Sequence, residues 1–179
     1  MPITKIISSG TAGPERGALD GALEYGVDLE GWCPKNKQPT GDNIPEGFKL
    51  WELDYESEEA RPIPNVIESD AILLFTHGTI SGDTLKIIEY CRKARRPFER
   101  IDLLRTGRLK AIQLISRWLL GTGDNDYDDY VATPPENCIL YVTGDRESKS
   151  PGIQQEVYLL MRELLNEVNG FWLYPIGEE

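Results

Sequence analysis

The sequence predicts a single α/β domain: a Rossmann-like, doubly wound, mainly parallel sheet with helices on both faces. Three observations support this. Strand-like apolar runs alternate with helical patterns along the 179 residues. The run 71–75 is apolar at every position, which is typical of a central strand buried on both faces. Glycine-rich segments also separate three of the strands from the helices that follow them, and ligands bind at such positions in open parallel sheets. The chain length predicts one domain over residues 1–179.

The first strand is expected at residues 3–8, followed by a glycine-rich loop at 9–13. A helix then begins with Pro14, which suits a first helical turn, and ends by Gly26. Its buried stripe is predicted to consist of Leu19, Ala22 and Leu23. The stretch 31–64 is irregular and rich in proline, glycine and charge, so we expect a long loop with one short strand near residues 48–53.

Two strand–helix units are predicted in the middle of the chain. The strand at 71–75 leads through a glycine-rich loop to a helix at about 83–95. A strand near 98–103 precedes a helix that carries apolar residues at helical spacing: Leu109, Ile112, Ile115 and Leu119.

The last unit has the clearest pattern. A strand at 138–143 and a loop at 144–151 precede a helix of about 17 residues, roughly 25 Å long. Asn169 and Gly170 end that helix. Its buried stripe is predicted to contain Ile153, Val157, Leu160, Met161, Leu164, Leu165 and Val168.

Composition excludes several classes of function. Nineteen Lys and Arg against thirty Asp and Glu give a net charge of −11, and nucleic-acid binding requires a basic face. The longest apolar runs have five residues, whereas a membrane span needs about 20. Three cysteines without paired spacing, and a first segment without an apolar leader pattern, predict a cytoplasmic protein.

Few residues are suited to catalysis or metal binding. His77 is the only histidine, which excludes His-centred triads and multi-His metal sites. Cys91 and Cys138 are expected to be buried, and Cys33 to lie in a loop with a structural role. The acidic segment 124–129 lacks the glycine and glutamate of a calcium loop, so it is interpreted as a solvated loop. No metal site is predicted.

The candidate binding residues lie in and beside the three glycine-rich loops. These loops contain neither a GxGxxG nor a GxxxxGK[ST] pattern, so no dinucleotide fingerprint or P-loop is present. Backbone N–H groups and hydroxyls at a helix N-terminus suit a phosphate, and Arg and Lys beside them can bind its charge. The candidates are Ser9, Gly10, Thr11, Arg16, His77, Gly78, Thr79, Ser81, Gly82, Thr84, Arg146 and Lys149.

Several candidates also have a simpler interpretation. The second loop can be an ordinary turn with Ser81 as a helix cap. Arg16 needs either an acidic partner or a bound anion, because a cation in the first turn of a helix opposes the dipole. His77 either binds ligand or hydrogen-bonds a loop. Arg146 can form a surface ion pair with Glu147 or another acid.

At these loops the chain resembles the molybdenum cofactor carrier proteins. That group is a branch of the Rossmann-like superfamily that includes the cytokinin-activating phosphoribohydrolases, often labelled lysine decarboxylases. The first segment departs from the family pattern SGGQTGxDR, since Ser9, Thr11 and Ala12 replace Gly, Gln and Thr. Asp83 also replaces a second glycine, and an acid there repels a phosphate. The resemblance is carried by residues 7–16, 18–20, 31–35, 69–70, 81–84 and 144–153.

The resemblance implies a non-catalytic protein that binds molybdenum cofactor, stores it and transfers it to molybdoenzymes. The cofactor is a pterin with a phosphate and a dithiolene-bound molybdenum, so it is strongly anionic. The matching segments add Lys35 and Ser148 to the candidate binding residues. The family resemblance further implies homo-oligomers, with tetramers expected, and transient contact with molybdoenzymes or cofactor-biosynthesis proteins. Apolar segments at 118–120 and 171–173 can serve as subunit contacts or as ordinary core.

Two alternatives stay open. One is a nucleoside-monophosphate phosphoribohydrolase, whose relatives carry a PGGxGTxxE motif with a catalytic glutamate. Aligning that threonine with Thr84 places Ile87 at the glutamate position, and Ile87 cannot perform acid–base chemistry. The other is a nucleotide or ADP-ribose sensor without chemistry.

Overall fold

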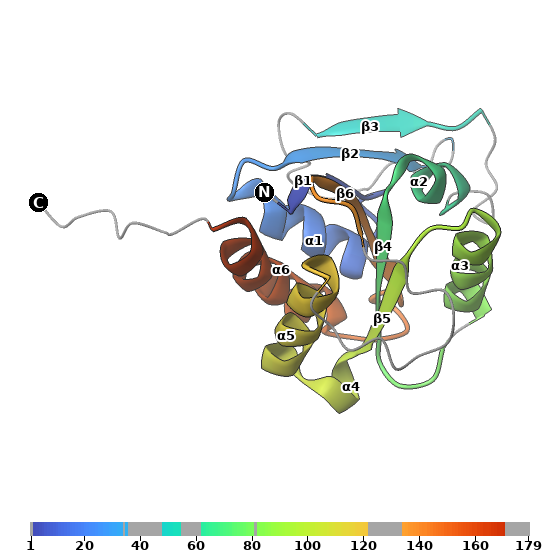
Figure 1. Cartoon of the computed structure of the whole chain (residues 1–179). Helices are drawn as coiled ribbons and strands as arrows, with labels where there is room; N and C mark the ends of the chain where they lie inside the picture. The colour runs from blue at the N-terminus through green and yellow to red at the C-terminus, as the bar shows by residue number, and fades with distance from the viewer. Residues whose placement is uncertain are drawn as a thin grey trace, which may run out of the picture.

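The protein contains a six-stranded, all-parallel sheet in the order β3-β2-β1-β6-β4-β5 (Figure 1). The computed structural model describes residues 2–33, 35, 48–54, 62–80, 82–121 and 134–170. The strands are β1 (Ile3–Ile7), β2 (Asp28–Cys33), β3 (Lys49–Glu52), β4 (Ala71–Thr76), β5 (Phe98–Asp102) and β6 (Cys138–Gly144). The helices are α1 (Pro14–Leu23), α2 (Pro62–Glu68), α3 (Gly82–Lys93), α4 (Leu103–Thr106), α5 (Arg108–Leu119) and α6 (Ile153–Asn169).

Helices cover both faces of the sheet, which confirms the predicted fold class. Alternate side chains of a strand point to opposite faces of the sheet, so one strand contributes residues to the hydrophobic cores on both faces. In β4, Leu73 and Phe75 belong to the core with α1, α5 and α6, whereas Ile72 and Leu74 pack with α2 and α3. All six β4 residues are buried, as the uninterrupted apolar run predicts.

The strand order brings three loops together at one edge of the sheet. After β1 the chain adds β2 and β3 on one side, then crosses to β4 and β5, and finally inserts β6 between β1 and β4. Since all strands are parallel, the loops that follow β1, β6 and β4 leave the same edge. The predicted convergence of the three glycine-rich loops is therefore confirmed.

The stretch 31–64 is more regular than the sequence suggests. The short strand near 48–53 is confirmed as β3, but β2 includes residues 31–33 and α2 begins at Pro62. The prediction of Cys33 in a loop is wrong, because Cys33 is a buried residue of β2. Asp28, Glu30 and Gly31 have low strand propensity and conceal β2 in the sequence, where pairing with β1 and β3 overrides that preference.

Several burial predictions change at the helix ends. Leu23 and Leu109 are exposed rather than part of the buried stripes. Each lies in a terminal turn of its helix, where the helix no longer packs against the core. Trp118 and Leu119 belong to the core and are not open for subunit contacts, whereas Leu120 is exposed. The segments 124–129 and 171–173 lie outside the described residues.

Other predictions are confirmed. The seven apolar residues of the last helix are all buried, and α6 has the expected 17 residues. Cys91 and Cys138 are buried, and burial raises the pKa of each thiol to about 12, so both stay protonated and unreactive at neutral pH. Among the helices of the described residues, none has the length and apolar character required to cross a membrane.

Candidate functional site

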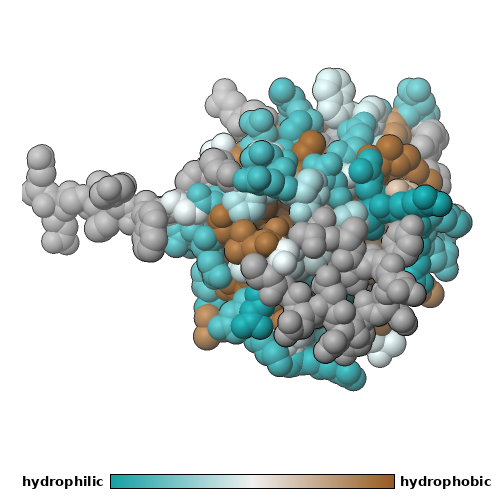
Figure 2. Space-filling model, viewed as in Figure 1, coloured by the Kyte–Doolittle hydropathy of each residue, from teal (hydrophilic) through white to brown (hydrophobic). Residues whose placement is uncertain are grey.

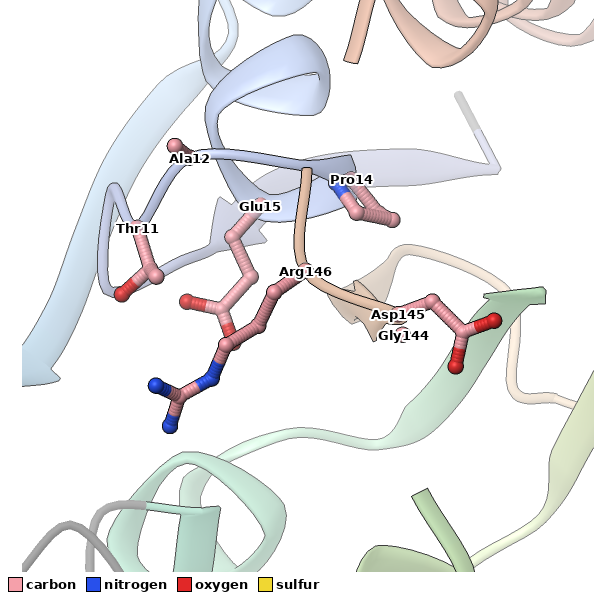
Figure 3. A pocket seen from close by; sticks show the side chains of 7 residues that line it. All are labelled: Thr11, Ala12, Pro14, Glu15, Gly144, Asp145 and Arg146. Carbon is pink, nitrogen blue, oxygen red and sulfur yellow. The ribbon is translucent and has the colours of Figure 1, made fainter. Parts of the chain in front are cut away.

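A small hollow lies between the loop after β1 and the loop after β6 (Figure 3). It opens to solvent, and its enclosed part has room for about one water molecule. Both loops begin where a central parallel strand ends, which is where this class of sheet binds ligands. The residues that line the hollow are Thr11, Ala12, Pro14, Glu15, Gly144, Asp145 and Arg146.

The Glu15 carboxylate joins the two loops. Its side chain starts in the first turn of α1 and is buried, with the residue 3% exposed. One carboxylate oxygen, Oε1, accepts from the hydroxyls of Tyr141 and Thr143 on β6, each at 2.9 Å. The other, Oε2, accepts from the Ser9 backbone N–H at 3.0 Å and from the Ser9 hydroxyl. Glu15 therefore fastens the β1 loop to the end of β6.

Asp145 makes a second junction on the opposite side of β6. Its carboxylate accepts from the His77 backbone N–H at 3.0 Å, the Thr84 hydroxyl at 3.1 Å and the Ser150 hydroxyl at 3.3 Å. The group is almost completely buried. Asp145 thus connects the loop after β4, the start of α3 and the loop after β6. Together with Glu15, it holds the three loops in one arrangement.

Gly144 allows the chain to reach this arrangement. Its φ of 144° is accessible mainly to glycine. A Cβ atom there would lie 1.9 Å from the Phe75 carbonyl oxygen on β4, so no other residue fits without moving the strand. The turn directs Asp145 toward β4 and leaves Arg146 on the side of the hollow, as Figure 3 shows.

Arg146 brings a positive charge to the hollow. In Figure 3 the side chain of Arg146 extends to the same side as those of Glu15 and Thr11, while Asp145 points the other way. The neighbouring Glu147 caps α6, accepting from the backbone N–H groups of Gly152 at 2.6 Å and Gln154 at 2.9 Å. The Glu147 backbone N–H also donates to the Ala12 carbonyl, which adds a direct bond between the β1 and β6 loops.

The structure brings together only some of the residues that the sequence nominates. Thr11 and Arg146 line the hollow, and Ser9 and Gly10 belong to the loop that forms its wall. Thr84 is buried against Asp145. Gly82 begins α3, whereas Ser148 and the exposed Lys35 follow β6 and β2. Ser81 lies outside the described residues.

Two of the nominated residues lie in ion pairs, and a third, His77, makes a hydrogen bond with an acidic side chain. Arg16 binds Asp20 through two contacts of 2.9 and 3.1 Å, so its partner is an acid, one of the two outcomes expected. Lys149 pairs with Asp83 at 3.4 Å on the surface. His77 contacts Glu156 at 3.0 Å and thereby joins the β4 loop to α6.

The β4 loop is braced by a separate acid. The Asp102 carboxylate accepts from the Gly78 backbone N–H at 2.9 Å. That hydrogen bond, aided by the Leu104 N–H and by Arg100 and Arg105, outweighs burial and lowers the pKa of Asp102. Gly78 and the neighbouring Thr79 therefore lie in a loop held by Asp102.

Sequence reasoning missed the residues that organise the site. In the sequence Glu15 indicates only an acid favoured by the helix dipole, and Asp145 only a loop residue. A signal was available: Tyr141 and Thr143 place polar groups at alternate positions of a strand whose pattern is otherwise that of a buried one, and Asp145 continues this spacing just beyond its end. Polar groups on a buried face need partners, which points to a buried hydrogen-bonded network.

Within the described residues, no group of three or more His, Cys, Asp or Glu side chains is arranged to hold a metal ion. Glu15 and Asp145 are held by hydroxyl and backbone donors that fix their orientation. A fixed pair of loops with one guanidinium at the opening suits the recognition of a small polar ligand.

The fold is that of a Rossmann-like α/β domain, and the candidate site lies at the switch point of the sheet. More specifically, the chain belongs to the circularly permuted YpsA SLOG family, whose model matches residues 6–165. A crystal structure from Syntrophus aciditrophicus SB, of a protein named "Putative molybdenum carrier protein", is similar with a TM-score of 0.77 and 30% sequence identity. The similarity covers 92% of this chain and 96% of that one. The chain matches none of the curated proteins.

Proposed function

We propose that this protein binds molybdenum cofactor and carries it unchanged to molybdoenzymes. The observation that carries the proposal is the similarity, over nearly the whole of both chains, to a protein named as a molybdenum carrier. The hollow with Arg146 at its opening supplies a site that suits an anionic ligand. In this proposal the protein transports the cofactor as a ligand and does not keep it as a permanently bound group.

Arg146 supplies the attraction for the anionic cofactor. The protein has a net charge of −11, so its long-range field repels anions and a cation at the contact must compensate. A guanidinium can donate two parallel hydrogen bonds to a phosphate. Complete sites for small molecules enclose roughly 300–1,000 Å³. The hollow is far smaller than that, so in this proposal it is a contact point for one group of the cofactor and does not enclose it.

The proposal also states that the protein does not hydrolyse nucleoside monophosphates. Ile87, at the position of the relatives' catalytic glutamate, is buried in the core with α2 and α3. A buried aliphatic side chain neither accepts nor donates a proton. We expect no release of free base from AMP at any protein concentration, measured by chromatography. Base release proportional to protein concentration would favour the phosphoribohydrolase alternative.

Binding is tested by titrating the protein with molybdenum cofactor and by assaying the purified protein for bound pterin after oxidation to a fluorescent product. Arg146→Ala should weaken binding roughly ten- to a hundredfold, because a hydrogen bond to a charged group contributes about 1.5–3 kcal/mol. Lys149→Ala should have a smaller effect with a stronger response to salt, since Lys149 is exposed and already paired with Asp83.

Arg117→Ala is the matched control. Arg117 is an exposed residue of α5 that does not line the hollow, and its loss changes the net charge by the same amount. It should bind the cofactor like the parent protein. Equal affinity of a folded Arg146→Ala variant and the parent would show that Arg146 does not hold the cofactor.

A further inference from the structure

We propose that the outer surface of α5 and α6 pairs with the same surface of a second copy of this chain, about a twofold axis. In this pair, Leu109 of one copy packs on Leu120 of the other, and Arg117 binds Glu167 across the interface. The pairing does not depend on the proposed binding of the cofactor. It builds dimers, so a tetramer requires a second, different contact between two such pairs.

Two leucines lie exposed and in line on α5. Leu109 is 73% exposed and Leu120, at the C-cap of the helix, is 56% exposed. Eleven positions separate them, so they lie within about 20° of each other around the helix axis and about 16 Å apart along it. Exposed large apolar side chains that lie in line on one face mark a surface that a partner can cover.

Charges of opposite sign lie on the two sides of this apolar line. Arg117 is exposed, about 80° around α5 from Leu109. In the other direction, about 100° from Leu109, Arg108 reaches α6 through its ion pair with Glu163 at 3.2 Å. Glu163 and Glu167 are exposed and lie one turn apart on that side of α6. Because α6 packs beside α5 (Figure 1), the surface changes from acidic through apolar to basic.

A surface with this pattern is complementary to itself about a twofold axis. When the axis passes through the centre of the apolar line, half a turn places the acidic side of one copy on the basic side of the other. The same contact forms twice, and the leucines meet in the middle. The leucines supply affinity, whereas the charges select the register.

The register of the pair follows from positions along the two helices. Both helices run in the same direction, because each follows a strand of an all-parallel sheet and packs back on it. The Arg108–Glu163 contact sets their offset, which places Glu167 level with the α5 residue one turn after Arg108. Arg117 then lies about 4 Å beyond the midpoint between the two leucines, and Glu167 about 4 Å before it. The axis that places Leu109 on Leu120 therefore also places Arg117 beside Glu167 of the second copy.

Both charged residues are available for this contact. Arg117 and Glu167 are exposed, and neither forms an ion pair with another of the residues that the structure describes. The contact between the copies therefore breaks no described ion pair. A cation of one copy that meets an acid of the next also offsets, at the contact, the repulsion between two chains of net charge −11.

The test reverses each charge and then exchanges them. The variants of the full chain are Arg117→Glu, Glu167→Arg and the double variant that carries both changes, and light scattering gives the mass of each assembly. Circular dichroism verifies that each variant is folded. Arg92→Glu is the matched control, since Arg92 is exposed on α3, which packs on the opposite face of the sheet, and its reversal changes the net charge as Arg117→Glu does.

We expect each single reversal to lower the mass of the assembly at least twofold, because it brings like charges together at both ends of the interface. Glu167→Arg is especially informative, since it lowers the net negative charge and would favour association if only the overall charge mattered. The double variant should associate like the parent. An equimolar mixture of the two single variants should also associate, since both contacts of the mixed pair then join opposite charges. Arg92→Glu should keep the parent mass.

The proposal is overturned if the parent stays a monomer throughout the micromolar range, which would leave this face free for another occupant such as a different acidic protein. It also fails if either folded single reversal keeps the parent mass, or if neither the double variant nor the mixture regains it. The proposed function has a separate outcome: a monomeric parent that binds molybdenum cofactor retains the carrier function and loses only the pairing. A parent that pairs as expected and binds no cofactor gives the converse result.

Discussion

At the scale of single residues, two buried carboxylates hold the candidate site together. Glu15 connects the β1 loop to β6, and Asp145 connects the β4 loop and α3 to the loop after β6. Buried carboxylates are costly unless hydrogen bonds compensate, so such groups persist where donors are arranged around them. Arg146 lies in the loop between these two junctions, which fixes the position from which its guanidinium extends.

The first stability prediction concerns Glu15. Glu15→Ala leaves the two β6 hydroxyls and the Ser9 N–H buried without their acceptor, and each unsatisfied group costs about 1–3 kcal/mol. We expect the free energy of unfolding, measured with urea, to fall by at least about 3 kcal/mol. Glu163→Ala is the control, because Glu163 is half exposed in a surface pair with Arg108 and should cost at most about 1 kcal/mol. Equal stabilities of the two variants would contradict a central role for Glu15.

At the scale of elements, α1 and α6 approach unusually closely, and this contact places both loops. Two glycines of α1 face α6 and allow the approach. A Cβ at Gly17 would lie 2.4 Å from the Gln154 carbonyl oxygen, and one at Gly21 would lie 3.0 Å from the Tyr158 carbonyl oxygen. The start of each helix follows one wall of the hollow, so the packing of the helices fixes the distance between the walls.

Gly17→Ala tests this contact. The added methyl group must push α1 away from the backbone of α6, and overpacking of this kind costs about 1–3 kcal/mol. We expect a lower midpoint of thermal unfolding together with weaker cofactor binding. The control is Gly82→Ala, since Gly82 lies in α3 and a Cβ there would meet no atom of the described residues within 4 Å. Alanine there should leave the stability unchanged or raise it by up to about 1 kcal/mol. If the unfolding midpoint of Gly17→Ala equals or exceeds that of the parent, the contact between α1 and α6 can accept a methyl group and is not as tight as proposed.

At the scale of the whole molecule, we propose a homo-oligomer, with a tetramer expected. Figure 2 shows apolar side chains in separate groups on the visible face of the described surface. Exposed large apolar residues of the described chain include Trp51, Ile67, Leu104, Leu109 and Leu120. Exposed apolar groups are buried when subunits associate.

Light scattering at micromolar concentration tests this proposal. We expect a mass near four times the 20.2 kDa of one chain. A mass near 20.2 kDa across the micromolar range would contradict any stable oligomer. The measurement is repeated at high salt, since screening the charge of −11 on each chain reduces repulsion between subunits and should favour association.

The sequence by itself determined the fold class, five of the six strands and the loops that carry the site. These features follow from local patterns: the uninterrupted apolar run of β4, the helical spacing of α6, and the glycines that end β1 and β6. A side-chain period depends only on residues close in the chain, so it can be detected without knowing what they pack against.

The tertiary structure alone decided which polar groups meet. Glu15 binds Tyr141 and Thr143 across more than 120 positions of sequence, and Asp145 meets Thr84 across 61. It also decided that β2 is a strand, since pairing on both sides overrides the low propensity of its residues. The order of the strands creates these contacts by inserting the last strand between β1 and β4. Because hydrogen bonds act over about 3 Å in space, whatever the separation along the chain, the geometry of the site arises only when the sheet is assembled.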